Sequence, residues 1–313
     1  MITIYKRTES GLEVLDQPVN NSWVNVVDPT PEEIEQLASW SIPMNFITYP
    51  LDVDERARTE REDDGSLMVL LRIPIFQGLH EDVPYSTVPL GIIMTSRMIV
   101  TVCRMPNDIL QELASGRVRG LETSKRNRFV LRVLLITASR YLSYLREINK
   151  VVDTVEDQLQ LSQRNRELLE LLKYQKSLVY FTTALKTNEL MMERLQRWQF
   201  FRMYSEDEDL LEDVITENQQ AIEMVNISTN ILSSTMDAFA SIISNNLNAV
   251  MKFLASATIV VNLPTIVYSF FGMNVDLPFQ DFPYAPYAFM IIFVLSISLS
   301  VVVILAFIRR DWF

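Results

Sequence analysis

The sequence predicts an α/β N-terminal domain that leads into a long helical hairpin, a stalk helix and two transmembrane α-helices. Three observations predict this fold class. Residues 1–105 contain short β-branched runs separated by turn residues, which are typical of strands. Residues 127–271 contain no Gly and a single Pro, and their apolar residues recur at helical spacing. Residues 253–271 and 287–308 carry no charge at all.

The first 105 residues alternate between strand and helix signals. The apolar-rich runs Met1–Lys6 and Leu12–Leu15 flank Ser10-Gly11, which predicts a hairpin. The segment from Asp28 to Glu33 combines a cap candidate, an early Pro and two acids, which together indicate a helix start. Further strands are predicted at Trp23–Val27, Leu67–Phe76, Thr87–Met94 and Met98–Arg104.

The next 170 residues or so favour long helices. Asn127–Gln163 and Arg166–Tyr204 predict an antiparallel hairpin, which completes a cytosolic domain over residues 1–205. A third helix over about 206–271 would be roughly 100 Å long and therefore resembles a stalk. Its residues alternate in steps of three and four, a heptad-like seam that comprises Leu211, Val214, Asn218, Ile222, Val225, Thr229, Leu232, Met236, Phe239, Ile243, Asn246 and Val250.

The C-terminal part divides into the stalk at 206–252, a first span at 253–271, an external loop at 272–286, a second span at 287–308 and a basic-aromatic tail at 309–313. Each span is long enough to cross a hydrocarbon core of about 30 Å. Lys252 precedes the first span and Arg309-Arg310 follow the second, whereas the connecting loop contains Asp276 and Asp281 without Lys or Arg. The positive-inside rule therefore places both termini in the cytoplasm and predicts a two-span plasma-membrane protein within a lipid bilayer.

Composition excludes several classes of function. The 313-residue chain has a net charge of −11, which argues against general nucleic-acid binding. Its single Cys (Cys103) and single His (His80) allow neither an intrachain disulfide nor a Cys/His zinc site. Any conventional His-based catalysis would require His80, and the chain contains no Gly-rich phosphate-binding motif. The sequence thus favours a protein that is not an enzyme.

The tripeptide Gly272-Met273-Asn274 stands where the first span meets the external loop. Together with an acidic cytosolic domain, a stalk and two spans, it resembles the CorA family of divalent-cation channels. Upstream, Asn248-x-x-Met251-Lys252-x-Leu254 and the Thr258, Pro264 and Thr265 positions also resemble the pore helix of that family. The alternative interpretation is an ordinary helix end, because Gly and Asn both serve as C-caps.

The resemblance implies a homopentamer with five stalk helices around one pore. Gly272 and Asn274 would then form the external mouth, with Met273 between them, and Mg²⁺ would be the transported ion and a regulatory ligand. Neutral oxygens suit Mg²⁺, which sheds its water reluctantly, and Asp276 and Asp281 would concentrate cations at the mouth. The resemblance also implies that Co²⁺ or Ni²⁺ passes.

One face of the first span is polar, and we interpret it as the pore lining. Its candidate residues are Asn248, Met251, Leu254, Thr258, Asn262, Thr265 and Ser269. A polar group such as Asn262 is costly at mid-membrane depth and tends to face water or a bundle interior, although hydrogen bonds between helices would also explain Ser and Thr. Asn262-Leu263-Pro264 departs from the family, which commonly has an apolar residue followed directly by Pro. Met251 and Leu254 are therefore candidates for a hydrophobic gate or for plain stalk packing.

Gating requires a cytosolic sensor. In the family, acidic residues between cytosolic domains bind Mg²⁺ and hold the pore closed, and Asp213 matches by its distance from Asn248. Glu81 and Asp82 are candidate partner acids, since bound ion would screen the repulsion between acidic subunits. The alternative is a solvated acidic face. At the level of the whole protein, the alternatives are a zinc transporter of the same superfamily and a non-conducting, membrane-tethered coiled coil.

Overall fold

The structure is a computed structural model that describes residues 1–8, 11–118, 120–162, 165–197, 205–273 and 287–310. The chain divides into two compact units, Met1–Met236 and Asp237–Phe313. Unit 1 contains a mixed sheet with helices on both faces, and the described part of unit 2 consists of helices rich in apolar residues. One helix, α6 (Ser205–Phe271), begins in unit 1 and continues into unit 2.

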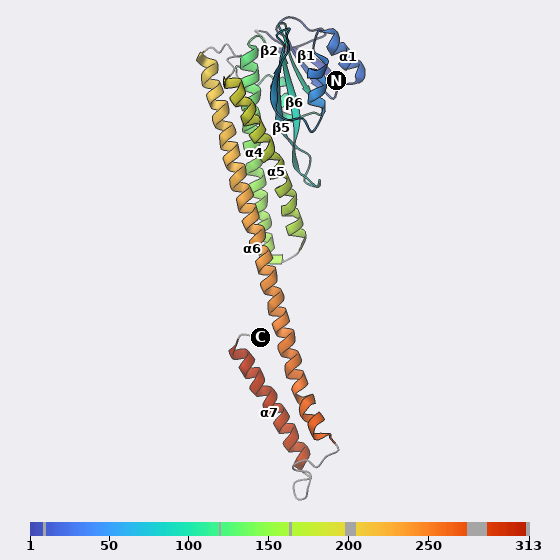
Figure 1. Ribbon diagram of the computed structural model, residues 1–313, viewed down its shortest axis with the longest axis vertical. Helices are drawn as coiled ribbons and strands as arrows, with labels where there is room; N and C mark the ends of the chain where they lie inside the picture. Colours follow the sequence, from blue (N-terminus) through green and yellow to red (C-terminus); the bar gives the residue numbers. More distant parts are fainter. Residues whose placement is uncertain (9–10, 119, 163–164, 198–204, 274–286, 311–313) are drawn as a thin grey trace. The chain divides into compact units, whose positions relative to one another are not determined.

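Seven strands form one sheet in the described part of unit 1, in the order β2-β1-β3-β7-β6-β5-β4 (Figure 1). The pair β3 and β7 is parallel, and the other neighbours are antiparallel. The strands are β1 (Ile2–Thr8), β2 (Gly11–Leu15), β3 (Trp23–Val27), β4 (Arg58–Arg61), β5 (Leu67–Phe76), β6 (Tyr85–Met94) and β7 (Ile99–Cys103). The central strands β6 and β7 are buried along almost their whole length, as expected for strands covered on both faces.

Each face of the sheet has its own hydrophobic core. On one face, Val24, Val100 and Met68 pack with α1 (Pro31–Ser39), α2 (Met44–Thr48) and the short helix η1 (Tyr49–Leu51). On the other face, Val69, Leu90 and their neighbours pack against α3 (Asp108–Ala114), α4 (Arg126–Ser162), α5 (Asn165–Arg197) and the start of α6. Trp23 anchors the second core, because its ring stacks on Tyr5 and its indole N–H donates to the Thr101 hydroxyl at 2.8 Å.

Most predicted elements are confirmed. The hairpin of β1 and β2 pairs Tyr5 with Val14, and the helix start appears at α1, where Thr30 and Glu33 form a capping box. The elements that the sequence patterns did not predict are α2, η1, β4 and α3.

The seam on α6 packs within the chain over its first half. Leu211, Val214, Asn218, Val225, Leu232 and Phe239 are buried, whereas Ile243 and Val250 are exposed. Asn218 donates to the Leu185 carbonyl oxygen of α5 at 3.5 Å, which is the limit of a hydrogen bond. In unit 1 the heptad-like pattern therefore describes a helix that completes a bundle with α4 and α5.

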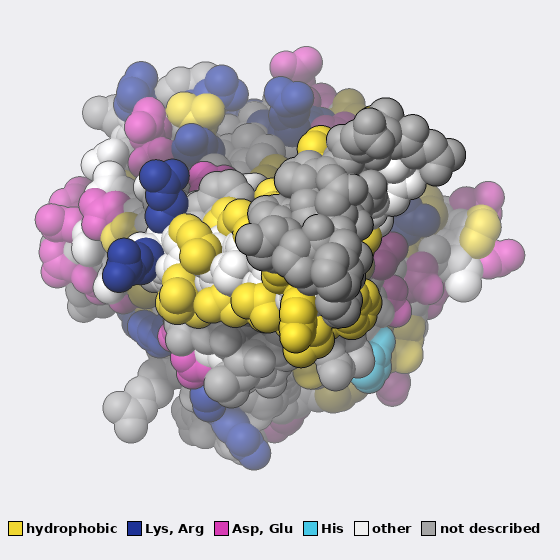
Figure 2. Space-filling model, turned by 90° about the horizontal axis from the view of Figure 1, so that it is seen from below, with side chains coloured by type: hydrophobic (Ala, Val, Ile, Leu, Met, Phe, Trp, Pro, Cys, Tyr) yellow, Lys and Arg dark blue, Asp and Glu magenta, His cyan; other side chains and the backbone are white. Residues whose placement is uncertain are grey.

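Unit 2 consists of the remainder of α6 and of α7 (Ala288–Arg309) among its described residues. Both helices are long and apolar enough to cross a membrane. Large apolar side chains are exposed along them, Val261 and Phe289 at 70% each, and hydrophobic side chains lie together on the face nearest the viewer in Figure 2. Such a surface requires lipid or other apolar partners.

Candidate pore helix and cytosolic acids

Helix α6 ends at the Gly-Met-Asn motif. The Gly272 N–H donates to the Tyr268 carbonyl oxygen at 2.9 Å, and the Met273 N–H approaches that of Phe270 at 3.4 Å. Gly272 does not have the left-handed conformation of a typical C-cap glycine, so the motif is not explained by that turn geometry. Asn274, Asp276 and Asp281 lie outside the described residues.

In unit 2, one face of α6 is covered by other residues of the same unit. Ser256 is fully buried and Ser296 of α7 is almost so, and Val260, Leu263 and Val267 are partly buried. At about 100° per residue these α6 positions share one side of the helix. The only other described element of unit 2 is α7, so this side is where the two helices pack.

The candidate pore residues lie on the opposite side of α6. At the same 100° per residue, their mean direction is roughly 200° from that of the covered face. All seven are exposed in the single chain: Asn248, Met251, Leu254, Thr258, Asn262, Thr265 and Ser269. The uncovered face that the spacing predicts is therefore available for a second copy or for water.

The polar groups on this face have no tertiary hydrogen-bond partner among the residues that the structure describes. The Thr258 hydroxyl donates to the Leu254 carbonyl oxygen of its own helix at 2.7 Å, which leaves the hydroxyl lone pairs free as acceptors. The side chains of Asn248, Asn262 and Ser269 form no hydrogen bond with any part of the chain that the structure describes. Transfer of a polar group from water into an apolar environment without a hydrogen bond costs about 2–7 kcal/mol of free energy. Asn262 therefore needs water, an ion or another subunit.

The acids predicted for sensing are all exposed, and one chain does not bring them together. Asp213 lies on α6, whereas Glu81 and Asp82 lie in the turn between β5 and β6. The backbone oxygen of Glu81 accepts a hydrogen bond from Lys173 of α5 at 3.1 Å. Within the described residues, no group of three His, Cys, Asp or Glu side chains is placed to hold a metal ion.

Helices α5 and α6 run antiparallel, and the hydrogen bond between Asn218 and Leu185 places these two residues at the same height along the helix bundle. Heights of other residues can be counted from this pair. At 1.5 Å per residue, Lys173 lies about 18 Å from Leu185, and Asp213 lies about 7 Å beyond Leu185 in the other direction. The Glu81 turn and Asp213 are therefore about 25 Å apart along the bundle.

A second acidic loop, Asp52–Glu55, lies nearer to the height of Asp213. Arg72 of β5 donates to the backbone oxygens of Val53 and Glu55 at 2.8 and 2.7 Å, and the Arg72 backbone bonds to Asn188 of α5. Asn188 is only three residues from Leu185. This loop was not among the predicted sites, although the run Asp52-Val53-Asp54-Glu55 was a visible signal. Asp52 and Asp54 are exposed.

The architecture defines a class of protein: a membrane protein with two apolar helices and a large N-terminal α/β unit that shares its last helix with the membrane part. A family model described as CorA-like Mg²⁺ transporter protein matches residues 20–310. The chain therefore belongs to the CorA family of divalent-cation transporters, which are embedded in membranes. This confirms the resemblance from the sequence.

Solved structures show the same fold. The complete CorA magnesium transporter from Methanocaldococcus jannaschii is 22% identical with a TM-score of 0.85, over 100% of this chain and 99% of that chain. The full-length CmaX protein is 16% identical with a TM-score of 0.71, over 99% and 96%. The ZntB cytoplasmic domain from Vibrio parahaemolyticus RIMD 2210633 is 11% identical with a TM-score of 0.60, over 79% and 97%. The comparison with curated proteins gave no match.

Proposed function

We propose that the protein is a channel-type Mg²⁺ transporter that assembles as a homopentamer, with the exposed polar face of α6 lining the pore. The observation that carries the proposal is the position of Asn262 on the side of α6 opposite the α7 contact. Asn262 is an exposed amide in an apolar helix, with no hydrogen-bond partner among the described residues. A ring of α6 helices would turn this face toward a central column of water and ions. The cost of an unpaired amide would then be removed.

Ion selection is assigned to Gly272, Met273 and Asn274 at the end of α6. Mg²⁺ prefers six oxygen ligands and loses its water slowly, so backbone carbonyls and an Asn amide would bind the hydrated ion without stripping it. Asp276 and Asp281 would raise the local cation concentration at the entrance. Met251 and Leu254 would form the hydrophobic constriction.

The proposed topology has both termini in the cytoplasm of a plasma-membrane protein. Inward flow is then driven by the membrane potential, at about 4.6 kcal/mol for a divalent ion at 100 mV, and no chemical reaction is catalysed. Co²⁺ and Ni²⁺ would share the path. Zn²⁺ is the alternative ion.

Gating is assigned to cytosolic Mg²⁺ bound between neighbouring subunits at Asp213. Rotation about a symmetry axis keeps heights along that axis, so with an axis parallel to α6 the partner acid must lie at the height of Asp213. The Asp52–Glu55 loop meets this condition better than Glu81 and Asp82. A channel with Asp213→Asn would therefore stay open at cytosolic Mg²⁺ levels that close the wild type. Asp52→Asn should also keep the channel open at these Mg²⁺ levels, and its effect should be larger than that of Glu81→Gln.

Flux into liposomes tests the transport proposal. Purified protein is reconstituted around a Mg²⁺-sensitive dye, the potential is clamped, and Mg²⁺, Co²⁺ and Zn²⁺ are compared. We expect potential-driven Mg²⁺ entry that Asn274→Ala abolishes, whereas the exposed α6 variant Asn230→Ala retains it. Asn262→Leu should reduce entry, and Ile259→Leu on another exposed side of α6 is its matched control.

Other outcomes would assign the protein differently. Zn²⁺ flux without Mg²⁺ flux would make it a zinc transporter. Absence of any flux from a folded oligomer, even after a chelator removes cytosolic divalent ions, would leave only a non-conducting scaffold.

A further inference from the structure

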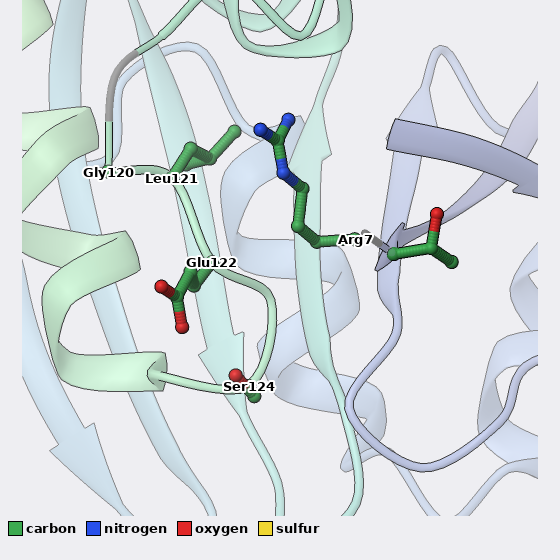
Figure 3. Close-up of a pocket in the computed structure, with 6 residues that line it drawn as sticks. Arg7, Gly120, Leu121, Glu122 and Ser124 are labelled. Carbon is green, nitrogen blue, oxygen red and sulfur yellow. The ribbon is translucent and has the colours of Figure 1, made fainter. Parts of the chain in front are cut away.

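A cavity lies in unit 1, between β1 and the segment that leads into α4. It has a volume of about 480 Å³ and is lined by Arg7, Thr8, Gly120, Leu121, Glu122 and Ser124. Arg7 extends from β1 toward the Gly120–Leu121 turn, whereas the Glu122 carboxylate points away from the guanidinium (Figure 3). Glu122 instead lies 3.8 Å from Lys125.

Several hydrogen-bond donors along this cavity have no acceptor among the described residues. The guanidinium of Arg7 forms no hydrogen bond or ion pair with any described residue, and neither does the Ser124 hydroxyl. The backbone N–H groups of Gly120, Glu122 and Ser124 donate to no described group either. A ligand rich in acceptor oxygens could accept hydrogen bonds from donors of this kind.

A second arginine stands behind the turn. The Nη2 atom of Arg132 lies 3.4 Å from the position that a Cβ on Gly120 would occupy, and Gly120 has φ +71°. The Nε atom of Arg132 is buried, and no hydrogen-bond partner is described for it. A buried donor without a partner on a charged group is destabilising, and a nearby anion would offset that cost.

Local charge has the opposite sign to that of the whole protein. Residues 117–132 contain six Arg or Lys and a single Glu, whereas the chain has a net charge of −11. Part of this positive charge is neutralised internally, because Arg128 pairs with Asp207 of α6 at 2.7 Å. Arg7 and Arg132 remain without such partners in the described structure. None of these residues has a role in the proposed ion transport.

We propose that this cavity binds the phosphate groups of a small anionic ligand, such as a nucleoside polyphosphate or an inorganic polyphosphate. Guanidinium groups bind phosphate in two-pronged geometry, and free backbone N–H groups and a hydroxyl add further donors. A volume of about 480 Å³ accommodates a ligand of this size. The site lies on α4, which the Arg128–Asp207 pair joins to the first turn of α6.

Calorimetric titration of the full-length protein in detergent tests the proposal. ATP, pyrophosphate and inorganic phosphate are titrated in Mg²⁺-free buffer at fixed ionic strength. We expect saturable binding of pyrophosphate or ATP that Arg7→Gln weakens about tenfold or more, because one charge-assisted interaction is lost. Arg146→Gln, which removes an exposed arginine elsewhere on α4, should leave the affinity unchanged.

Arg132→Gln should weaken binding as Arg7→Gln does. Because Arg132 is partly buried, its variant is interpreted only if its circular dichroism matches the wild type; Arg7 is exposed, so its variant provides the test in any case. Binding of pyrophosphate shows that the phosphates alone suffice, and binding of ATP alone shows that a nucleoside is also required. Absence of saturable binding, or equal weakening by Arg7→Gln and Arg146→Gln, would overturn the proposal.

Discussion

Asn188 of α5 completes the hydrogen bonding of β5 where the neighbouring strand stops. β4 pairs with β5 only from Leu67 to Leu70, so Arg72 has no strand partner on that edge. The Asn188 Oδ1 atom accepts from the Arg72 N–H at 2.9 Å, and its amide donates to the Arg72 carbonyl oxygen at 2.8 Å. The side chain of Asn188 is fully buried.

Asn188→Ala removes both bonds and leaves the Arg72 N–H unpaired. That N–H costs about 1–3 kcal/mol, whereas the carbonyl oxygen keeps its bond from the Tyr141 hydroxyl at 3.0 Å. With the lost second bond, we expect the free energy of unfolding to fall by about 2–4 kcal/mol. Asn188→Asp keeps an acceptor for the N–H but sets a buried carboxylate against the Arg72 carbonyl oxygen, so its loss should be at least as large at neutral pH.

Thermal unfolding of the full-length protein in detergent, followed by circular dichroism, measures the effect. For a unit of this size, 2–4 kcal/mol corresponds to a fall in apparent Tm of roughly 4–16 °C. Asn226→Ala, an exposed position on α6, should change stability by less than about 0.5 kcal/mol. If Asn188→Ala unfolds at the same temperature as Asn226→Ala, the two bonds from Asn188 do not stabilise the edge of β5.

Three further predictions concern unit 1. A Cβ on Gly91 would overlap Pro50 Cγ, so Gly91→Ala should lower the free energy of unfolding by about 1–3 kcal/mol in a denaturant titration. Pro50→Ala in the same chain should recover part of this loss. Burial raises the pKa of the Cys103 thiol to about 11, so iodoacetamide should label this thiol only after the protein unfolds. Mass spectrometry measures the labelled fraction. Because the unfolded thiol has a pKa of about 8.5, stability should fall as the pH rises from about 8.5 toward 11. Thr30→Ala removes the α1 cap and should lower stability by about 1 kcal/mol; no change would argue against the capping box.

The elements with strong patterns were predictable. The strand Trp23–Val27 has the predicted bounds, and α6 begins and ends within a residue of the prediction. By contrast, β4 is the segment Arg58–Arg61, which contains three charged residues and no apolar alternation. Its strand conformation comes from pairing with β5, so no local signal existed.

The candidate site divides in the same way. The polar stripe on α6 follows from helical periodicity, which is a local property, and its role as a pore lining stays a prediction. The height difference between Asp213 and Glu81 follows from how α5 pairs with α6, which no spacing in the sequence contains. The Asp52–Glu55 loop is connected to the height of Asp213 through Arg72 and Asn188, a link that the sequence does not show.

The sequence by itself determined the family, the two apolar helices and the polar face of α6, because these depend on composition, on a short motif and on the 3.6-residue period. Tertiary structure alone decided which half of the α6 seam is buried within the chain. It also decided that the Asp52–Glu55 loop lies nearer than Glu81 to the height of Asp213, and that Arg7 and Arg132 both lie near Gly120. These placements bring together residues far apart in the sequence, such as Arg72 and Asn188, and their geometry arises from the packing of the sheet against α4, α5 and α6 rather than from any local pattern.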